Sequence, residues 1–328
     1  MKIEDIRQMY QQGNIDTKEY AARMFEKYEE LFAYKELLKQ SKVKEISINE
    51  QEVLFKIFMN SIANNAQEYE VIMELQKKDS AAVQNTILSL GDYESEELDM
   101  VSRIVDFIRK EENKATFFDI GANLGWYTIN IKKQYPDMEV YAFEPVKENY
   151  LRLQKHMSLN QVSGVNAYNI GMHCENTNME FYYDICASGA SSLANLLEHD
   201  DTEIVSCKVV RLDDFVNEHS VSSIDFIKCD VEGSELFVYE GGLDSIKRYK
   251  PVIFSEMLRK WAAKFGYHPN DIIELLATAG YECYVIGDQG KLKKFSRVDE
   301  RTVEKNYFFF HPQKHEAVLH QMEEGWME

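Results

Sequence analysis

The sequence has few basic residues and no long apolar run, and each shortage excludes a class of protein. Lys and Arg number 37 against 56 Asp and Glu, which gives a formal net charge of −19. Nucleic acid and anionic membranes attract clustered positive charge, so neither is an expected partner. No apolar run approaches the roughly 20 residues that cross a bilayer, so we expect no membrane insertion.

Cysteine is also scarce, which argues against a zinc site or a disulfide framework. The five cysteines are an odd number, and no CxxC pair occurs. Zinc ligation and disulfide pairing are therefore not expected. Free thiols suit a reducing compartment, and residues 1–5 contain no apolar signal core. These features predict a cytoplasmic protein.

Residues 1–80 lack proline and are predicted to be all-helical. Asp16 with Glu19, and Ser47 with Glu50, have the spacing of capping boxes. Apolar residues recur at helical spacing in two stripes: Tyr20, Met24, Tyr28, Leu31, Tyr34 and Leu37, then Ile48, Val53, Leu54, Phe58 and Ile62. We expect a helical region over 1–80 that packs on the main domain, or that acts as a lid or as a homodimer interface.

The remainder, 81–328, alternates apolar strand candidates with helix candidates. Strands are predicted at 115–120, 139–143, 165–170, 224–229, 251–255, 281–286 and 306–310. Helices are predicted between most of them, at 125–135, 147–159, 234–249 and 269–279. This order predicts an α/β fold with a seven-stranded, Rossmann-like, doubly wound sheet. An inserted arm is expected near 178–212, and the last strand is expected to be antiparallel.

A turn with glycines four residues apart follows the first predicted strand of this domain. Gly121 and Gly125 flank Asn123, and Asp119 precedes them. A strand, a tight turn and a helix in this order hold nucleotide-like cofactors. A dinucleotide fingerprint needs glycine where Asn123 stands, and Asp119 would repel a diphosphate. The pattern favours a cofactor with a cationic group, such as the amino group of S-adenosylmethionine.

The next strand ends in a second acidic residue. Glu144 and Pro145 follow the apolar segment 140–143. A carboxylate at this place accepts hydrogen bonds from ribose hydroxyls in cofactor-binding folds. Glu144 is therefore predicted to mark the ribose end of the cofactor site.

Several blocks occur in an order that resembles the FkbM family of S-adenosylmethionine-dependent methyltransferases. They are DIGANLGWYT from 119, FEP from 143, LNQV from 159, GASSL from 189, RLDDF from 211, IDFIKCDVEGSE from 224 and KPVIFSE from 250. The resemblance covers roughly 90–290. It implies that the cofactor contacts Asp119, Gly121, Ala122, Asn123, Gly125, Tyr127, Glu144, Pro145, Ile170 and Asp230. Cys229, His156 and Ile170 depart from the residues usual in the family.

The resemblance also implies methyl transfer to hydroxyls of sugars, glycans or polyketide-like products. Such a hydroxyl must lose a proton, so the catalytic candidates are acids at strand ends and a nearby lysine: Asp230, Glu232, Glu256 and Lys228. Asp230 is the first candidate for the base, with a pure cofactor contact or helix cap as the alternative. Lys228 is expected to form an ion pair with a neighbouring acid, and a substrate contact is the minority interpretation.

The predicted function is O-methyl transfer from S-adenosylmethionine to a small-molecule or glycan acceptor. Asp230 and Glu256 suit a divalent metal such as Mg²⁺, but no further ligand cluster is evident, so a metal is not favoured. Two alternatives stay open: a nicotinamide-dependent oxidoreductase, and a non-catalytic binding protein with a vestigial pocket.

Overall fold

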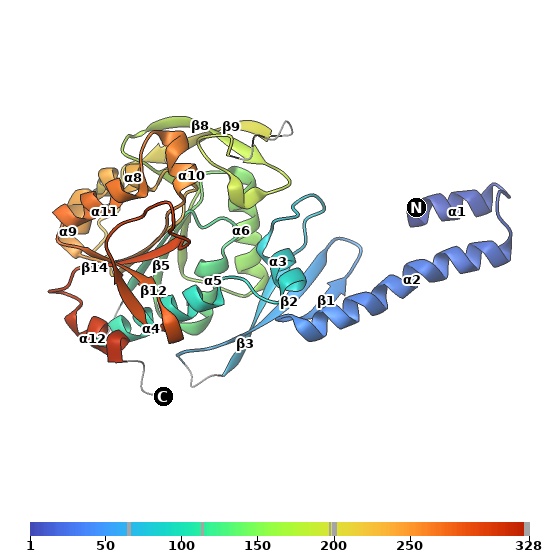
Figure 1. The fold of residues 1–328 in the computed structure, drawn as a ribbon. Coiled ribbons are helices and arrows are strands. Elements are labelled where there is room, and N and C mark those ends of the chain that lie inside the picture. Colours follow the sequence, from blue (N-terminus) through green and yellow to red (C-terminus); the bar gives the residue numbers. More distant parts are fainter. Residues whose placement is uncertain (64–66, 113–114, 197, 199–201, 325–328) are drawn as a thin grey trace.

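The computed structural model describes residues 1–63, 67–112, 115–196, 198 and 202–324 (Figure 1). The N-terminal elements are α1 (Ile3–Gln11), α2 (Thr17–Gln40), β1 (Val43–Ile48), β2 (Val53–Asn60), β3 (Glu68–Glu74), α3 (Val83–Leu90) and α4 (Ser95–Glu112). The central elements are β4 (Thr116–Ile120), α5 (Trp126–Gln134), β5 (Glu139–Phe143), α6 (Lys147–Leu159), β6 (Val165–Tyr168), β7 (Gly171–Met172), β8 (Thr177–Asp184), η1 (Ser188–Ala190) and β9 (Thr202–Val210). The remaining elements are α7 (Leu212–Glu218), β10 (Phe226–Cys229), α8 (Glu235–Gly241), α9 (Leu243–Tyr249), β11 (Val252–Glu256), α10 (Arg259–Ala262), η2 (Ala263–Phe265), α11 (Pro269–Thr278), β12 (Glu282–Ile286), η3 (Asp288–Gly290), β13 (Leu292–Phe295), β14 (Asn306–Phe310) and α12 (Glu316–Glu324).

The main sheet has the predicted doubly wound form. Its strand order is β13-β12-β14-β11-β10-β4-β5-β6. The strands from β6 to β11 run parallel, and β14 lies antiparallel between β11 and β12, so the expected antiparallel last strand is confirmed. All seven predicted strands are present, and β13 adds an eighth at the edge, antiparallel to β12.

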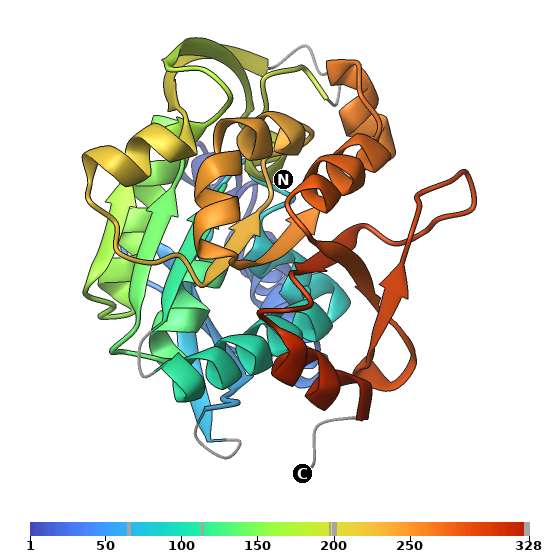
Figure 2. The ribbon, with the colours of Figure 1, turned by 90° about the vertical axis from the view of Figure 1, so that its left-hand side faces the viewer.

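Helices cover both faces of this sheet because its central strands are apolar on both sides (Figure 2). Residues of α4, α5 and α12 share one buried cluster with Phe117 and Phe226, and α6 lies on the same face through Leu153 against Ala142. Residues of α7, α8, α9 and α11 pack on the opposite face around Phe118. This layering leaves the carboxyl ends of β4, β5, β10 and β11 together at one edge.

The prediction that residues 1–80 are all-helical is wrong. Residues 43–74 form an antiparallel sheet in the order β1-β2-β3. Ser47, the expected cap of a helix, lies in β1, and Asn49 instead accepts hydrogen bonds from the amides of Gln51 and Glu52 in the following turn. Along β2, burial alternates at Phe55, Ile57 and Met59, as in a strand with one covered face.

The small sheet packs on the main domain, where His156 of α6 and the residue that caps α6, Asn160, satisfy the open edge of β3. Asn160 accepts from the amide of Ile72 at 2.8 Å and donates to its carbonyl at 2.7 Å. His156 accepts from the amide of Glu74 at 3.1 Å, and its other ring nitrogen lies 2.9 Å from the carbonyl of Leu124. Burial lowers the pKa of His156, which suits a neutral ring in this bridging position.

The first two helices form a hairpin that extends away from the main domain (Figure 1). The predicted cap of α2 is confirmed, because Asp16 accepts from the amide of Glu19 at 2.8 Å. The hairpin has a small core of its own around Ile6, Ile15 and Met24. Much of α2 is exposed beyond this core.

The expected arm is confirmed as a hairpin of β8 and β9, whose cluster of buried residues includes Phe181, Tyr183 and Val209. Between the two strands, Ser192 pairs back with Tyr182 of β8. Within the described residues, no helix is both long and apolar enough to cross a membrane.

Candidate active site

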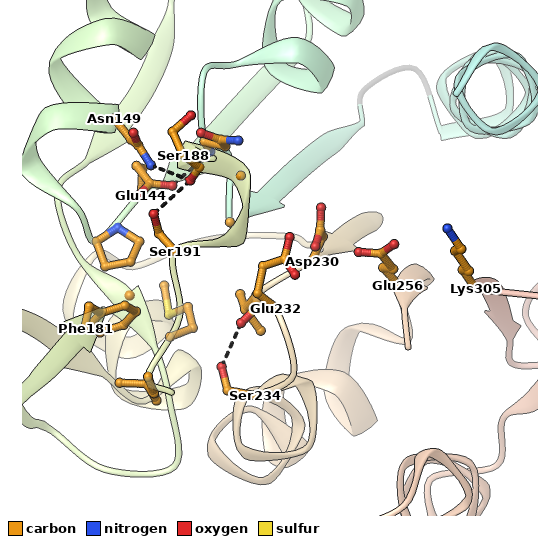
Figure 3. A pocket seen from close by; sticks show the side chains of 18 of the residues that line it. Glu144, Asn149, Phe181, Ser188, Ser191, Asp230, Glu232, Ser234, Glu256 and Lys305 are labelled. Atoms are coloured by element: carbon orange, nitrogen blue, oxygen red, sulfur yellow. Dashed lines mark hydrogen bonds between the residues drawn. The ribbon is translucent and has the colours of Figure 1, made fainter. Parts of the chain in front are cut away.

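A cavity of about 280 Å³ lies at the carboxyl ends of the central strands. Its lining includes acids from both sides of β4, polar residues of the arm loop and one lysine. Residues that line it include Tyr93, Glu94, Gly121, Asn123, Glu144, Pro145, Asn149, Ser188, Ser191, Asp230, Glu232, Glu256 and Lys305. Figure 3 shows Glu144, Asn149 and Ser188 on one side, and Asp230, Glu232 and Glu256 on the other.

The glycine turn after β4 forms the floor of this cavity. Gly121 has φ 76°, and a Cβ there would lie 1.8 Å from the carbonyl oxygen of Asp230. Gly125 has φ 87°, and a Cβ there would lie 2.4 Å from Leu153. Only glycine fits both positions, so the two glycines allow β10 and α6 to approach the turn closely.

Asp119 and Lys228 form a buried ion pair beneath the glycine turn. They are directly paired in register on β4 and β10, and both are almost fully buried. One carboxylate oxygen of Asp119 accepts from the amide of Thr128 at 3.0 Å and from its hydroxyl at 2.6 Å. The other lies 3.6 Å from the ammonium of Lys228, which donates to the carbonyl of Gly121 at 2.8 Å. The cation beside Asp119 is therefore Lys228, and neither residue lines the cavity.

The ion pair expected for Lys228 is present and extends to Asp230, at 3.4 Å. Burial alone lowers the pKa of Lys228. Attraction from Asp230, Asp119 and Glu94 outweighs burial and raises the pKa above its usual value. Lys228 thus stays charged and holds the turn against β10.

Glu144 organises the β5 side of the cavity. Its two oxygens accept hydrogen bonds from the amides of Val146 and Asn123, each at 2.9 Å. Burial raises the pKa of Glu144 to about 7, and these two amides act in the opposite direction. The carboxylate is therefore fixed by the backbone on both sides while it faces the cavity.

Three carboxylates gather on the β10 and β11 side. Asp230, Glu232 and Glu256 each place an oxygen within 4.8 Å of the others, which makes them a possible cation-binding group. Burial, and then repulsion from Asp230, raises the pKa of Glu232 and Glu256 well above its usual value. Both therefore bind protons more readily than exposed carboxyl groups do, and a metal ion would have to compete with protons for them.

The turn after β10 carries Asp230 and Glu232, and its backbone is held by several contacts. Glu232 has φ 54°, a left-handed conformation that costs a non-glycine residue on the order of 1 kcal/mol. The side chain of Glu235 accepts from the amides of Val231 and Gly233 at 3.1 and 3.0 Å, which fixes this turn. The hydroxyl of Ser192 donates to the carbonyl of Glu232 at 2.7 Å, so the arm contacts the turn directly.

Glu94 and Tyr93 line the cavity and were not predicted. Glu94 precedes α4 and accepts a hydrogen bond from the hydroxyl of Tyr127 at 2.9 Å. Burial, followed by repulsion from Asp230, raises the pKa of Glu94 to about 7. Only its position just before an amphipathic helix sets Glu94 apart in the sequence, and many surface acids share that position.

The predicted residues therefore separate into two groups. The first group lines the cavity and comprises Gly121, Asn123, Glu144, Pro145, Asp230, Glu232 and Glu256. The second group is absent from the lining and comprises Asp119, Ala122, Gly125, Tyr127, Ile170 and Lys228. Tyr127 is buried behind Glu94, Ala122 is buried in the turn, and Ile170 packs against the core beside α7.

An apolar doubly wound sheet with an acidic cavity at its carboxyl edge suits a Rossmann-like methyltransferase, and comparison with known proteins agrees. The sequence profile of the methyltransferase FkbM domain matches residues 119–283, half of the chain. The chain belongs to the FkbM methyltransferase family.

Curated relatives share this central part. "Methyltransferase 1" of Beauveria bassiana (strain ARSEF 2860) is 30% identical over 142 residues, which cover 38% of this chain and 56% of the relative. "31-O-demethyl-FK506 methyltransferase FkbM" of Streptomyces tacrolimicus is 28% identical over 154 residues, which cover 39% of this chain and 59% of the relative. The chain thus spans little more than half the length of these two relatives. The crystal structure of methyltransferase FkbM from Methylobacillus flagellatus KT aligns with a TM-score of 0.38 and 16% identity, over 60% of this chain and 44% of that one.

Proposed function

We propose that the protein is an S-adenosylmethionine-dependent O-methyltransferase that acts on a hydroxyl of a neutral small molecule, sugar or glycan. The observation that carries the proposal is the pair of acidic groups on opposite sides of the glycine turn. Glu144 follows β5, and Asp230 follows β10, the two strands that flank β4. Methyltransferase activity itself follows from the family.

The lining suits this cofactor. Its ribose hydroxyls, its ammonium and its adenine amino group are all hydrogen-bond donors, and its sulfonium is positive. Within the described part of the chain, the buried oxygens Asn123 Oδ1 and Asp230 Oδ1 accept no hydrogen bond. Buried oxygens that accept no hydrogen bond suit a ligand with many hydrogen-bond donors. A lining rich in carboxylates suits a ligand with positive charge. A nicotinamide dinucleotide would bring a diphosphate to the same acids, which disfavours it.

When bound, the cofactor supplies an electrophilic methyl group. The chain's task is to orient the acceptor hydroxyl and to take its proton. Asp230 suits this task because one of its oxygens faces Lys228 and the other lacks a donor. Glu232 and Glu256 lie beside Asp230, and each of the three acids places an oxygen within 4.8 Å of the others. The same acids repel an anionic acceptor, so a neutral hydroxyl compound is favoured.

The test is transfer of a labelled methyl group from S-adenosylmethionine to a panel of neutral, anionic and cationic hydroxyl compounds. We expect transfer to a neutral acceptor. Asp230→Asn should lower turnover about 100-fold or more, as for loss of a general base, with affinity for S-adenosylhomocysteine mostly retained. The matched control is Asp244→Asn, because Asp244 is exposed on α9. Binding of NAD without binding of S-adenosylhomocysteine would contradict the proposal.

A further inference from the structure

The left-handed residue just before α4 lies in the cavity but outside the region that the family profile matches. We propose that Glu94 holds the ammonium group of the amino acid portion of S-adenosylmethionine. This inference rests on the function proposed above and adds a residue from the N-terminal side of the chain to the cofactor site. Glu94 precedes the matched region, residues 119–283, by 25 positions.

The direction of the cofactor follows from the strand order. Glu144 marks the ribose side, because it follows β5 and faces the cavity. In S-adenosylmethionine the ribose and the amino acid leave the sulfur in different directions. An amino acid portion bound on the far side of Gly121 from Glu144 would reach the β10 side, where Asp230 and Glu94 line the cavity.

Glu94 is the carboxylate that suits this end. The acid of the glycine turn, Asp119, already contacts Thr128 and Lys228 and does not line the cavity. Glu94 does line it, and the hydroxyl of Tyr127 orients its carboxylate. Burial raises the pKa of Glu94, and repulsion from Asp230, which lines the same cavity, raises it further. A ligand ammonium placed beside both carboxylates relieves that repulsion.

The backbone of Glu94 is left-handed, and neighbouring contacts hold it in place. Its φ of 45° is unusual for a residue with a side chain. The preceding residues are fixed by the end of α2 and the start of β1. The amide of Lys42 donates to the carbonyl of Gly91 at 3.1 Å, and the ammonium of Lys42 lies 2.9 Å from Asp92 and also contacts Ser95. These contacts pre-organise Glu94 at the cavity wall.

The experiment compares two ligands by calorimetry. S-Adenosylhomocysteine carries the amino acid, whereas 5′-methylthioadenosine has the same adenosine and thioether without it. Glu94→Gln, which keeps the size of the side chain, should weaken S-adenosylhomocysteine about tenfold or more and leave 5′-methylthioadenosine within twofold. Glu96→Gln is the matched control, because Glu96 is exposed on the same turn of the chain.

A second measurement needs no variant. The wild-type protein should bind the deaminated analogue of S-adenosylhomocysteine about tenfold or more weakly than the parent compound. Equal affinity for the two compounds, or an equal loss of both ligands in Glu94→Gln, would overturn the role of Glu94. A wild-type protein that binds neither adenosine ligand would instead overturn the proposed function.

Discussion

Asp79 and Ser188 lie 109 positions apart in the chain and meet in a hydrogen-bonded pair at the rim of the cavity. The hydroxyl of Ser188 donates to Asp79, and the amide of Ser188 lies 3.4 Å from the other carboxylate oxygen. Arg152 of α6 pairs with the same carboxylate at 3.0 Å, and the side chain of Asp79 is fully buried. The N-terminal part of the chain thus secures the arm loop that lines the cavity.

Asp79→Ala should therefore destabilise the protein and loosen the arm loop. Removing one partner of a buried ion pair leaves Arg152 uncompensated, and we expect a loss of roughly 3–5 kcal/mol in the free energy of unfolding. Urea denaturation measures this loss. Asp99→Ala is the control, because the pair of Asp99 with Arg103 is exposed and longer, at 3.7 Å, and should contribute little. Equal midpoints for the two variants would refute the structural role of Asp79.

Glu144→Ala should weaken the binding of S-adenosylhomocysteine by roughly 1–3 kcal/mol, since ribose hydroxyls would lose a charged acceptor. The affinity of 5′-methylthioadenosine should fall by the same amount, because both ligands carry the ribose. Glu148→Ala is the matched control, because Glu148 is an exposed acid on the neighbouring α6. If Glu144→Ala binds normally, the ribose end of the site has been assigned wrongly.

The carboxylate group Asp230, Glu232 and Glu256 predicts an outcome for metal removal. Burial, and then repulsion from Asp230, raises the pKa of Glu232 and Glu256, so protons compete with a cation for this group of acids. We expect methyl transfer to continue unchanged in EDTA. A loss of activity that Mg²⁺ restores would show that these three acids bind a metal during turnover.

Glu94 predicts a pH dependence that distinguishes the two adenosine ligands. The pKa of Glu94 is about 7 in the free protein, and only its ionised form attracts an ammonium. The ratio of affinities, S-adenosylhomocysteine over 5′-methylthioadenosine, should rise between pH 6 and pH 8 and then level off. Using the ratio removes the contribution of Glu144, whose pKa is also about 7 and whose effect the two ligands share.

The charged or titratable groups that influence Glu94 are Asp230, Lys228, Tyr127, Glu97, Tyr93, Glu232 and Glu256. Glu94→Gln should abolish the rise, and a rise that persists in this variant would assign it to another of these groups.

We propose that a second copy of this chain covers α2. Phe25, Leu31 and Phe32 of α2 are each more than half exposed, a costly arrangement for large apolar side chains in a projecting helix (Figure 1). The helix carries five basic and five acidic residues in a chain of net charge −19, so two copies of α2 can approach without strong repulsion. Its first half has one excess positive charge and its second half one excess negative charge, which favours antiparallel pairing.

Light scattering after gel filtration should accordingly give the mass of a dimer, and Leu31→Ser combined with Phe32→Ser should give a monomer. Val303→Ser is the control, because Val303 is even more exposed but lies in a loop. A wild-type monomer at micromolar concentration would contradict the pairing.

The main sheet was predictable because its strands are buried on both faces and read as short apolar runs. Phe117, Phe118 and Ile120 in β4, for example, are all buried, and the glycine turn that follows needs no distant partner to be recognised. The small sheet was not predictable in the same way. Leu54 and Phe58 match a helical period by coincidence, while the buried residues of β2 share a core cluster with residues of α5, far along the chain.

The same distinction explains the site. Gly121 and Glu144 follow predicted strands, so their meeting is a property of the fold. Glu94 enters the cavity through long-range contacts, with Tyr127 of α5 and with the segment held by Lys42. Likewise Asp119 has the expected place in the chain, but its contacts depend on Lys228 one strand away. Neither contact can be inferred from the spacing of residues in the sequence.

Five carboxylates line the cavity, from Glu94, Glu144, Asp230, Glu232 and Glu256, and this excess acidity bears on product exchange. On the proposed function, each methyl transfer converts a sulfonium into a neutral thioether, so the spent ligand carries one positive charge fewer than the donor. An acidic lining holds the donor more tightly than the spent ligand. The charge of the cavity wall would thus favour replacement of product by fresh donor in each catalytic cycle.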